Sequence, residues 1–496
     1  MSLAADRPAV SRSLTGPIWI ALAIAALLSV LVLNGRPLFY FDTGGYVAQG
    51  ETALKSLGWR DAAPMVSSTG QDSAATPAAD VSVKGTVDGS RSAVYALFAG
   101  FFARLGALEG LIALNVIGVL LSVWLIARVV LRSQENLRIA PFVALPIIVA
   151  CLGSLPFFVA YLMPDTLTPI MILNLGLLGV YARQMRWWEI LLALAMASFA
   201  VVSHLSHLAI AVLMLPVVVI VGAVLGQRRW WLLPTLVAAV LAIGYSEQMA
   251  LRAAASAVAK SDVIIKPFIT ARLIQDGPGR SYLARHCPDT AIATCALADA
   301  LGKSDNPMRF TASHIVFQTS PELGSFRLLP PDQQVAVARD QVSFFLDVLK
   351  EAPFETTAAF VRNMLIQTTM FAVDMTVPTE SQQTANADVR GALSGPLVLG
   401  RLAPDDGWIK ALTIGQGLVY GASLLVILLL VLLPGRISPQ LRALALVVLA
   451  GILANALVCG GISQPASRYG ARVIWLLPLM ATLMTMVALR PYRRVT

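Results

Sequence analysis

The sequence predicts an all-α polytopic membrane protein of about ten transmembrane helices, with interfacial helices and a mostly helical extracytoplasmic domain. Two observations support this prediction. Of the 496 residues, 57% are hydrophobic and only 13% are charged, whereas a soluble domain has about 25% charged residues. The apolar residues also occur in long blocks, and a helix needs roughly 20 such residues to cross a hydrocarbon core of about 30 Å.

Ten apolar stretches reach or approach this length. They cover residues 17–34, 109–131, 139–160, 166–183, 188–203, 205–226, 230–249, 409–433, 441–461 and 472–489. The first stretch follows Arg7 and Arg12, as the apolar part of a signal peptide would. It is longer than the apolar part of a cleaved signal peptide, and no small-residue cleavage site follows it, so we expect it to remain as an anchor.

The arginines predict the orientation, because positive residues are retained on the cytoplasmic side of a membrane. Fourteen of them fall at the two ends of the chain and in alternate short loops. These are Arg7, Arg12, Arg128, Arg132, Arg138, Arg183, Arg186, Arg228, Arg229, Arg436, Arg442, Arg490, Arg493 and Arg494. The other short loops carry only Arg468 and Arg472. Topology therefore accounts for the net charge of +9, and we expect no nucleic-acid partner.

This alternation places both termini in the cytoplasm and two long loops, 35–108 and 250–408, outside it. We expect a bacterial inner (plasma) membrane, with these loops periplasmic or extracellular. The predicted regions are an N-terminal membrane module (1–250), an extracytoplasmic domain (251–408) and a C-terminal membrane module (409–496).

Helical spacing of apolar residues predicts amphipathic helices at 46–57 and 92–107 in the first outer loop, with a flexible loop at 61–91 between them. We expect these helices to be interfacial, the second one interfacial or re-entrant.

The second outer loop is predicted to be helical at 331–352 and 355–374, with a break at Pro353, and loop-like from 375 to 408. Cys287 and Cys295 lie in this loop and either form a disulfide or remain free thiols.

Charged side chains are nearly absent inside the expected spans, and the polar residues that could carry chemistry gather at the outer ends of the spans. They are Asp42, Asp165, His204, His207, Glu247, Arg468 and Arg472, with Glu247 expected at the end of the seventh span. An ion-coupled transporter usually carries acids or histidines at mid-membrane depth, so this distribution argues against one. If the outer ends converge, a carboxylate could act as a general base toward a hydroxyl, and arginine could hold a phosphate with its bidentate fork.

Three motifs resemble the GT-C superfamily of polytopic membrane glycosyltransferases. They are Asp42 followed by the stretch Arg-Ser-Ala-Val-Tyr-Ala-Leu-Phe at 91–98, the stretch Met-Pro-Asp-Thr-Leu at 163–167, and the pair Arg468-Tyr469. The resemblance covers residues 1–250 and 409–490 in layout, whereas the loop at 250–408 matches no characterised family.

The resemblance implies an inverting transfer of a sugar from a polyprenyl-phosphate donor, within a membrane lipid environment, to a glycan, lipid or protein hydroxyl. It implies that Asp42 is the general base, that Asp165 positions the donor, the acceptor or a divalent cation, and that Arg468 binds the lipid phosphate. We expect four further residues to bind substrate, namely His204, His207, Tyr469 and Arg472. Mg²⁺ or Mn²⁺ would be held by Asp42 and Asp165, although many members have a second acid in the first loop and here the nearest one is Glu51.

Structural roles are the alternatives for the same residues. Asp42 and Asp165 could cap helices, the histidines could be hydrogen-bonded packing residues, and the aromatic run from Phe39 to Phe41 is more often an interfacial anchor than a sugar platform. The alternative functions are a transporter or flippase for a lipid-linked glycan, and a membrane scaffold with an extracytoplasmic binding domain. The scaffold requires Asp42, Asp165 and Arg468 to lie far apart, whereas the enzyme requires them to meet.

Overall fold

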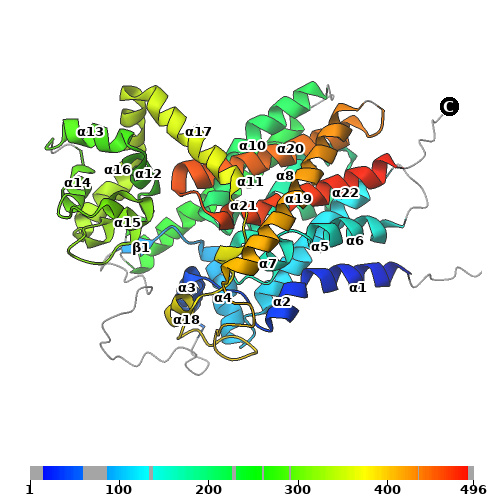
Figure 1. Ribbon diagram of the computed structural model, residues 1–496, viewed down its shortest axis with the longest axis horizontal. Coiled ribbons are helices and arrows are strands. Elements are labelled where there is room, and N and C mark those ends of the chain that lie inside the picture. Colours follow the sequence, from blue (N-terminus) through cyan, green and yellow to red (C-terminus); the bar gives the residue numbers. More distant parts are fainter. Residues whose placement is uncertain are drawn as a thin grey trace, which may run out of the picture.

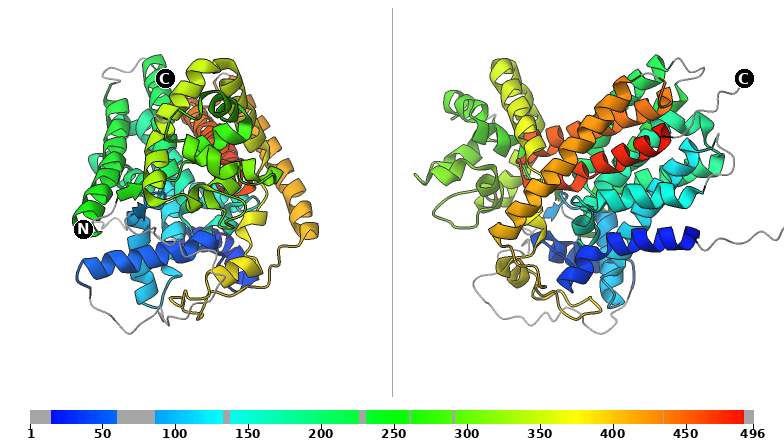
Figure 2. Two further views of the ribbon diagram at one scale, coloured as in Figure 1. Left: turned by 90° about the vertical axis from the view of Figure 1, so that its left-hand side faces the viewer. Right: turned by 45° about the vertical axis from the view of Figure 1, so that its right-hand side comes forward.

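The computed structural model describes residues 15–59, 86–132, 138–225, 231–259, 262–289, 292–433 and 435–489. It is built almost entirely of helices, which form a long bundle and a smaller lobe at one end of it (Figures 1 and 2). The first described helix begins and the last one ends at the opposite end of the bundle from the lobe (Figure 1). Seven of the fourteen arginines that predict the orientation lie outside the described residues. Residues 61–85 of the expected flexible loop also lie outside them. The arginines concerned are Arg7, Arg12, Arg228, Arg229, Arg490, Arg493 and Arg494.

Seven of the described helical segments are long and apolar enough to cross a membrane, so the chain is an integral membrane protein. They are α5 (Gly110–Val130), η1 with α8 and η2 (Pro164–Thr166, Leu167–Tyr181, Ala182–Gln184), α10 (Leu205–Val224), α11 leading into η3 (Leu232–Ala254, Ala255–Ala259), α19 (Asp406–Leu432), α20 with η7 (Pro439–Ala456, Leu457–Ser463), and α21 with α22 (Ser467–Ile474, Leu476–Ala488).

Three of the ten expected spans fall on shorter helices, so the count of ten is not reproduced by helix length. They are α1 (Thr15–Leu27), α6 (Ile139–Ala150) and α9 (Trp187–Val202), of 13, 12 and 16 residues. Helix α6 contains Pro146, which has no N–H to donate, and the chain turns before a short α7 (Leu155–Val159). A turn at Leu28 likewise separates α1 from α2 (Ser29–Asn34).

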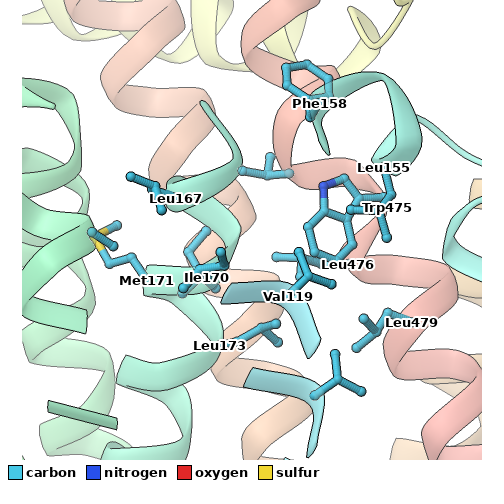
Figure 3. Packing of buried hydrophobic residues seen from close by; sticks show 14 of the residues in the cluster. Val119, Leu155, Phe158, Leu167, Ile170, Met171, Leu173, Trp475, Leu476 and Leu479 are labelled. Carbon is cyan, nitrogen blue, oxygen red and sulfur yellow. The ribbon is translucent and has the colours of Figure 1, made fainter. Parts of the chain in front are cut away.

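Helix α8 lies at the centre of the bundle, where all of its residues from Leu167 to Tyr181 are buried. Small residues let the neighbouring helices approach it closely. A Cβ on Gly179 would lie 2.7 Å from the Val218 side chain of α10, and one on Gly176 would lie 3.1 Å from Leu444 of α20. Figure 3 shows apolar side chains of α5, α7, α8 and α22 interdigitating beside it. The start of α8 is therefore shielded from lipid.

The two amphipathic stretches of the first outer loop form α3 (Phe41–Ser56) and α4 (Ala93–Arg104), which pack against each other. Glycines make the contact possible, because a Cβ on Gly50 would overlap the Ala96 carbonyl and one on Gly100 would overlap the backbone at Gly50. This pair carries Asp42 at the start of α3.

The lobe is a group of short helices with its own hydrophobic cluster. It comprises β2 (Asp262–Ile264), α12 (Phe268–Asp276), α13 (Pro278–His286), α14 (Cys295–Leu301), η4 (Pro307–Phe310), α15 (Ala312–Phe317), η5 (Phe326–Leu328) and α16 (Pro331–Glu351). Strand β2 pairs in parallel with β1 (Thr86–Asp88) of the first outer loop. Cys287 and Cys295 form a disulfide between the end of α13 and the start of α14.

Helix α17 (Pro353–Thr369) runs from the lobe back to the bundle (Figure 1). Helix α16 ends at Glu351 and α17 begins at Pro353, where the sequence predicts the break, but α17 ends at Thr369 rather than at 374. The stretch 375–408 is mostly irregular, with η6 (Asp374–Thr376) at its beginning and α18 (Glu380–Ala385) within it.

Candidate functional site

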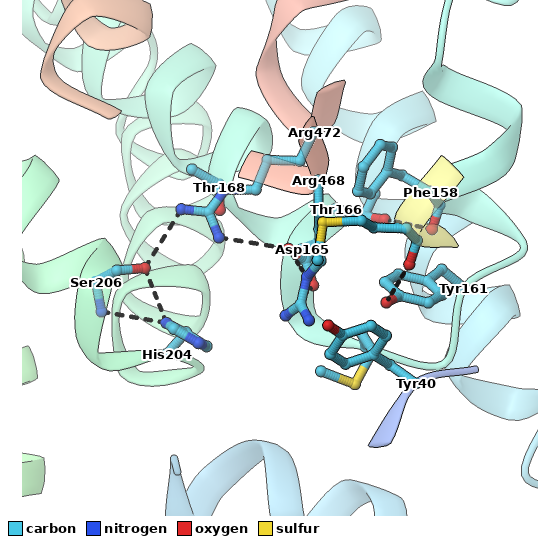
Figure 4. Close-up of polar contacts among 12 residues, drawn as sticks. Tyr40, Phe158, Tyr161, Asp165, Thr166, Thr168, His204, Ser206, Arg468 and Arg472 are labelled. Atoms are coloured by element: carbon cyan, nitrogen blue, oxygen red, sulfur yellow. Dashed lines mark hydrogen bonds and ion pairs between the residues drawn. The ribbon is translucent and has the colours of Figure 1, made fainter. Parts of the chain in front are cut away.

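A buried ion cluster lies where α8 begins. The Asp165 carboxylate, 1% exposed, accepts a hydrogen bond of 3.1 Å from Arg468 Nε and one of 3.4 Å from Arg472 Nη1, both on Oδ1 (Figure 4). Arg468 Nη2 approaches Oδ2 to 3.1 Å, an ion-pair contact without hydrogen-bond geometry, so Oδ2 can still accept a bond. One carboxylate thus faces two guanidinium groups.

Helix α21 brings both arginines to this carboxylate, because residues four apart share one face of a helix. Arg472 is fully buried and also donates to Asn455 Oδ1 on α20, at 2.8 Å from Nη2, and to Ser206 Oγ on α10, at 3.3 Å. A buried guanidinium is tolerated only with such partners. The sequence places both arginines before the last span, whereas the structure places them inside the helical segment Ser467–Ala488.

Aromatic rings surround Arg468 and bring the first outer loop into the site. Its guanidinium carbon lies 4.7 Å from the ring centre of Tyr40, 5.8 Å from that of Tyr161 and 5.7 Å from that of Tyr469. Rings at these distances attract a cation. Tyr40 was expected to be an interfacial anchor, but it packs on a buried arginine instead.

A backbone bridge holds the segments that precede the two acids side by side. Leu38 N–H donates to Ala160 O at 2.9 Å and Leu162 N–H donates to Leu38 O at 2.8 Å, which aligns the chain before Asp42 with the chain before Asp165. Burial raises the pKa of the Tyr40 phenol; Arg468 lowers it, and Asp42 and Asp165 both raise it. Both carboxylates therefore act on the same side chain.

Asp42 lies in the first turn of α3 and is 41% exposed in its side chain. Its Oδ1 accepts from Arg91 Nη2 at 3.0 Å, and its other oxygen has no partner among the described residues. Ser92 fixes the position of Arg91, because it caps α4 and donates to Val202 O at the end of α9 at 2.5 Å. Asp42 is thus a partly exposed carboxylate held by one oxygen.

Neither acid serves as the helix cap that the sequence offered as an alternative. At α3 the Tyr40 N–H donates to Thr43 Oγ1 at 3.0 Å, and Asn386 Oδ1 accepts from Gly44 N–H at 2.7 Å. The Asp165 carboxylate makes no capping bond and is engaged by arginines.

His204, between α9 and α10, is partly buried and neutral. Its Nδ1 accepts from Ser206 N–H at 3.1 Å, so the ring proton lies on Nε2, which has no partner among the described residues. Burial lowers the pKa of His204 to about 4, and the positive charge of Arg472 adds to this. His204 therefore offers a hydrogen-bond donor at Nε2, and its acceptor nitrogen, Nδ1, is already engaged by Ser206.

His207 was expected to bind substrate, but both of its ring nitrogens are occupied. Nδ1 lies 2.7 Å from Ala200 O and must donate to it, so Nε2 accepts from Thr168 Oγ1 at 2.6 Å. The residue is fully buried because it lies deeper in α10 than His204. Glu247 also differs from expectation: it lies inside α11, not at its end, and bonds to Gln248.

The carboxylates do not suit a divalent cation. In the described part of the chain no three His, Cys, Asp or Glu residues come together as metal ligands. Mg²⁺ requires oxygen ligands in near-octahedral geometry, but Asp42 faces Arg91 and Asp165 faces two arginines. We therefore derive no step through the Mg²⁺ or Mn²⁺ ion that the sequence suggested.

Four residues of the site were not identified from the sequence: Arg91, Tyr161, Ser206 and Asn455. Arg91 begins the stretch 91–98 that carries the family resemblance, and this could have identified it. Asn455 is a polar residue within an apolar span, where such residues usually have a specific partner.

A cavity of about 510 Å³ lies away from this cluster, at the junction of the end of α11, β2 and α16. Its lining includes Arg252, Arg339 and Asp262, but Arg339 and Asp262 are exposed and pair with each other at 2.9 Å. Exposed pairs of this kind contribute little binding energy. The buried charges at Asp165 therefore make the stronger candidate site.

Comparison with models of protein families, with curated proteins and with solved structures finds no match for this chain. The function is therefore inferred from the chemistry of the site.

Proposed function

We propose that this protein is a GT-C-like membrane glycosyltransferase that moves a sugar from a polyprenyl-phosphate donor to a hydroxyl acceptor at the outer face of the membrane. The observation that carries the proposal is the excess of guanidinium charge at Asp165. The buried Arg468 and Arg472 both face this one carboxylate, so the cluster has one more positive than negative charge. An anionic ligand would balance this charge.

Arg468 is the residue best placed for the phosphate. Its Nε and Nη2 are turned to Asp165, and its remaining hydrogen-bonding neighbour among the described residues is the Tyr40 phenol. A guanidinium held in this way forms strong, oriented bonds to phosphate oxygens. In the proposed site Nη1 of Arg468 and the Nε2–H of His204 donate to the phosphate or to a neighbouring sugar oxygen.

Asp42 would act as the general base. Its unpartnered oxygen takes the proton of the acceptor hydroxyl as that oxygen attacks the anomeric carbon. The bond from this carbon to the phosphate oxygen breaks in the same step, and polyprenyl phosphate leaves as an anion stabilised by Arg468. Direct displacement inverts the anomeric centre. Arg91 would orient Asp42 through the other oxygen.

The proposed orientation keeps both termini cytoplasmic in a bacterial inner membrane, with ten crossings and the lobe periplasmic. Arginines at the end of the bundle away from the site support this orientation. Arg128 and Arg132 pair with the buried Glu189, and the Arg128 guanidinium lies 5.1 Å from the ring of Trp188. Tryptophan is typical of either membrane interface, and an excess of arginine is typical of the cytoplasmic one.

The alternatives explain fewer of these contacts. A scaffold has no need for Asp42, Asp165 and Arg468 to lie together, and the packing of Tyr40 on Arg468 counts against it. A flippase for a lipid-linked glycan could use the same phosphate-binding arginine. It has no step that requires the free oxygen of Asp42.

Binding of a polyprenyl phosphate to the purified protein in detergent tests the role of Arg468. We expect the wild type to bind it much more tightly than the uncharged polyprenol, and Arg468→Ala to weaken binding by about 30- to 150-fold, since a buried charged hydrogen bond is worth roughly 2–3 kcal/mol. Arg468→Lys keeps the positive charge but lacks the bidentate guanidinium, so it should weaken binding less than Arg468→Ala does. The exposed Arg390→Ala serves as the control. Equal affinity of the wild type and Arg468→Ala would rule out this site.

A further inference from the structure

Helix α17 connects the lobe to the segment that carries both arginines. At one position Asn363 Nδ2 donates to Asp276 Oδ2 of the lobe at 2.7 Å. One turn later Gln367, which is buried, pairs twice with the backbone of Ala466: its Nε2 donates to Ala466 O and its Oε1 accepts from Ala466 N–H, both at 2.9 Å. The side-chain amide of Gln367 thus forms the same pair of hydrogen bonds with the Ala466 backbone that a neighbouring β-strand would form.

Ala466 is extended and immediately precedes α21, so this pairing acts at the start of the arginine helix. The turn after α17 adds two contacts to the same helix end. Ser467 Oγ donates to Asp374 Oδ1 at 2.5 Å, and Gly470 lies so close to Met370 O that a Cβ there would overlap it. Arg468 is only two residues from Ala466, so its position depends on these contacts.

Helix α17 also packs on η7, which ends at Ser463, three residues before Ala466. A Cβ on Gly460 of η7 would lie 2.7 Å from Asn363 O, which requires the backbones to touch. Residues 464–466, between η7 and α21, belong to no helix or strand. Gln367 therefore supplies the hydrogen bonds that regular secondary structure would otherwise provide.

We propose that Gln367 is a positioning residue that sets Arg468 for the phosphate of the lipid donor, and that the lobe holds Gln367 in place through Asn363 and Asp276. This inference rests on the proposed function, because it assigns Arg468 to the phosphate. A binding group must lie within about 0.5 Å of its productive position, and the hydrogen bonds of Gln367 go to backbone atoms of Met370 and Ala466 and not to Asp165 or Arg468.

A double-mutant cycle on affinity for a polyprenyl phosphate in detergent tests this coupling. We expect Gln367→Ala to weaken binding by about tenfold in the wild-type background. In the Arg468→Ala background we expect it to change binding by less than about twofold, because the group that it positions is gone. Gln367→Glu keeps the acceptor but sets a carboxylate oxygen against the Ala466 carbonyl, so we expect it to weaken binding at least as much as Gln367→Ala in the wild-type background, and it serves as the second variant if the alanine variant folds poorly.

Gln334→Ala is the matched control, since Gln334 is also buried and bonds two backbone carbonyls, of Arg327 and Leu329, but within the lobe. We expect it to leave affinity within about twofold of the wild type. If Gln367→Ala or Gln367→Glu weakens binding equally in both backgrounds, Gln367 acts only through general stability and the inference is overturned. If Arg468→Ala itself leaves affinity unchanged, the phosphate assignment fails instead.

Discussion

Asp42→Asn is expected to lower the rate of sugar transfer by about a thousandfold while leaving affinity for a polyprenyl phosphate within about threefold. The amide has nearly the shape of the carboxylate and can still accept from Arg91, so the local packing is retained. It cannot accept the proton of the acceptor hydroxyl. General bases contribute roughly 10²- to 10⁴-fold to enzymatic rates, and the loss should appear in the catalytic step.

Transfer can be followed in membranes as the loss of labelled sugar from the polyprenyl-phosphate pool. Asp332→Asn is the matched control, because Asp332 lies in the first turn of α16 as Asp42 does in α3, so both substitutions remove the same favourable interaction with a helix dipole. A rate for Asp42→Asn equal to that of this control would show that Asp42 is not the base.

Asp165→Asn is expected to destabilise the protein by about 3–5 kcal/mol, because it leaves two buried guanidinium groups without their counter-ion. Arg468 and Arg472 are both almost inaccessible to water, and Asn455 and Ser206 offer neutral acceptors to Arg472 alone. The loss should appear as a lower midpoint of thermal unfolding in detergent.

Glu189→Gln provides the comparison at the other end of the bundle. Glu189 is also buried and also pairs with two arginines, but the side chains of Arg128 and Arg132 are 28% and 33% exposed and can turn to water. We therefore expect a smaller loss of stability for Glu189→Gln than for Asp165→Asn. A loss as large or larger for Glu189→Gln would mean that Asp165 is not the main counter-ion of a buried site.

The sequence predicts the helices well where apolar residues run without interruption, as in α5 and α10. It fails where local chemistry breaks such a run: Gly153, Ser154 and Pro156 lie in the expected span 139–160, and α6 ends before them at Ala150. The sequence also predicts an end of the seventh span near Glu247, because a charged residue usually marks the boundary of an apolar span. In the structure α11 continues to Ala254. Composition marks where a helix can lie in a membrane and does not fix its ends.

For the site, the sequence selects Asp42, Asp165, Arg468 and Arg472 as candidates from their expected position at the outer helix ends. It does not predict which groups pair. The partner of Asp42 is Arg91, 49 positions along the chain, and that pairing depends on the packing of α3 on α4.

The two histidines show the same limit of sequence reasoning. They are three residues apart and were expected to share a role. Their roles differ because the proton of each ring is placed by a different partner, the Ser206 N–H for His204 and the Ala200 carbonyl for His207. These partners depend on the three-dimensional geometry of the turn between α9 and α10, which the spacing of residues in the sequence does not give.

The most direct test of the account is to measure lipid-linked sugars and surface glycans in cells that lack the protein and in cells complemented with wild type, Asp42→Asn or Asp332→Asn. We expect the deletion strain and the Asp42→Asn strain to accumulate a polyprenyl-phosphate sugar and to lack one surface glycan, and the other two strains to restore it. Identical glycans in all strains would contradict the enzyme and favour a scaffold, and full restoration by Asp42→Asn would favour a flippase.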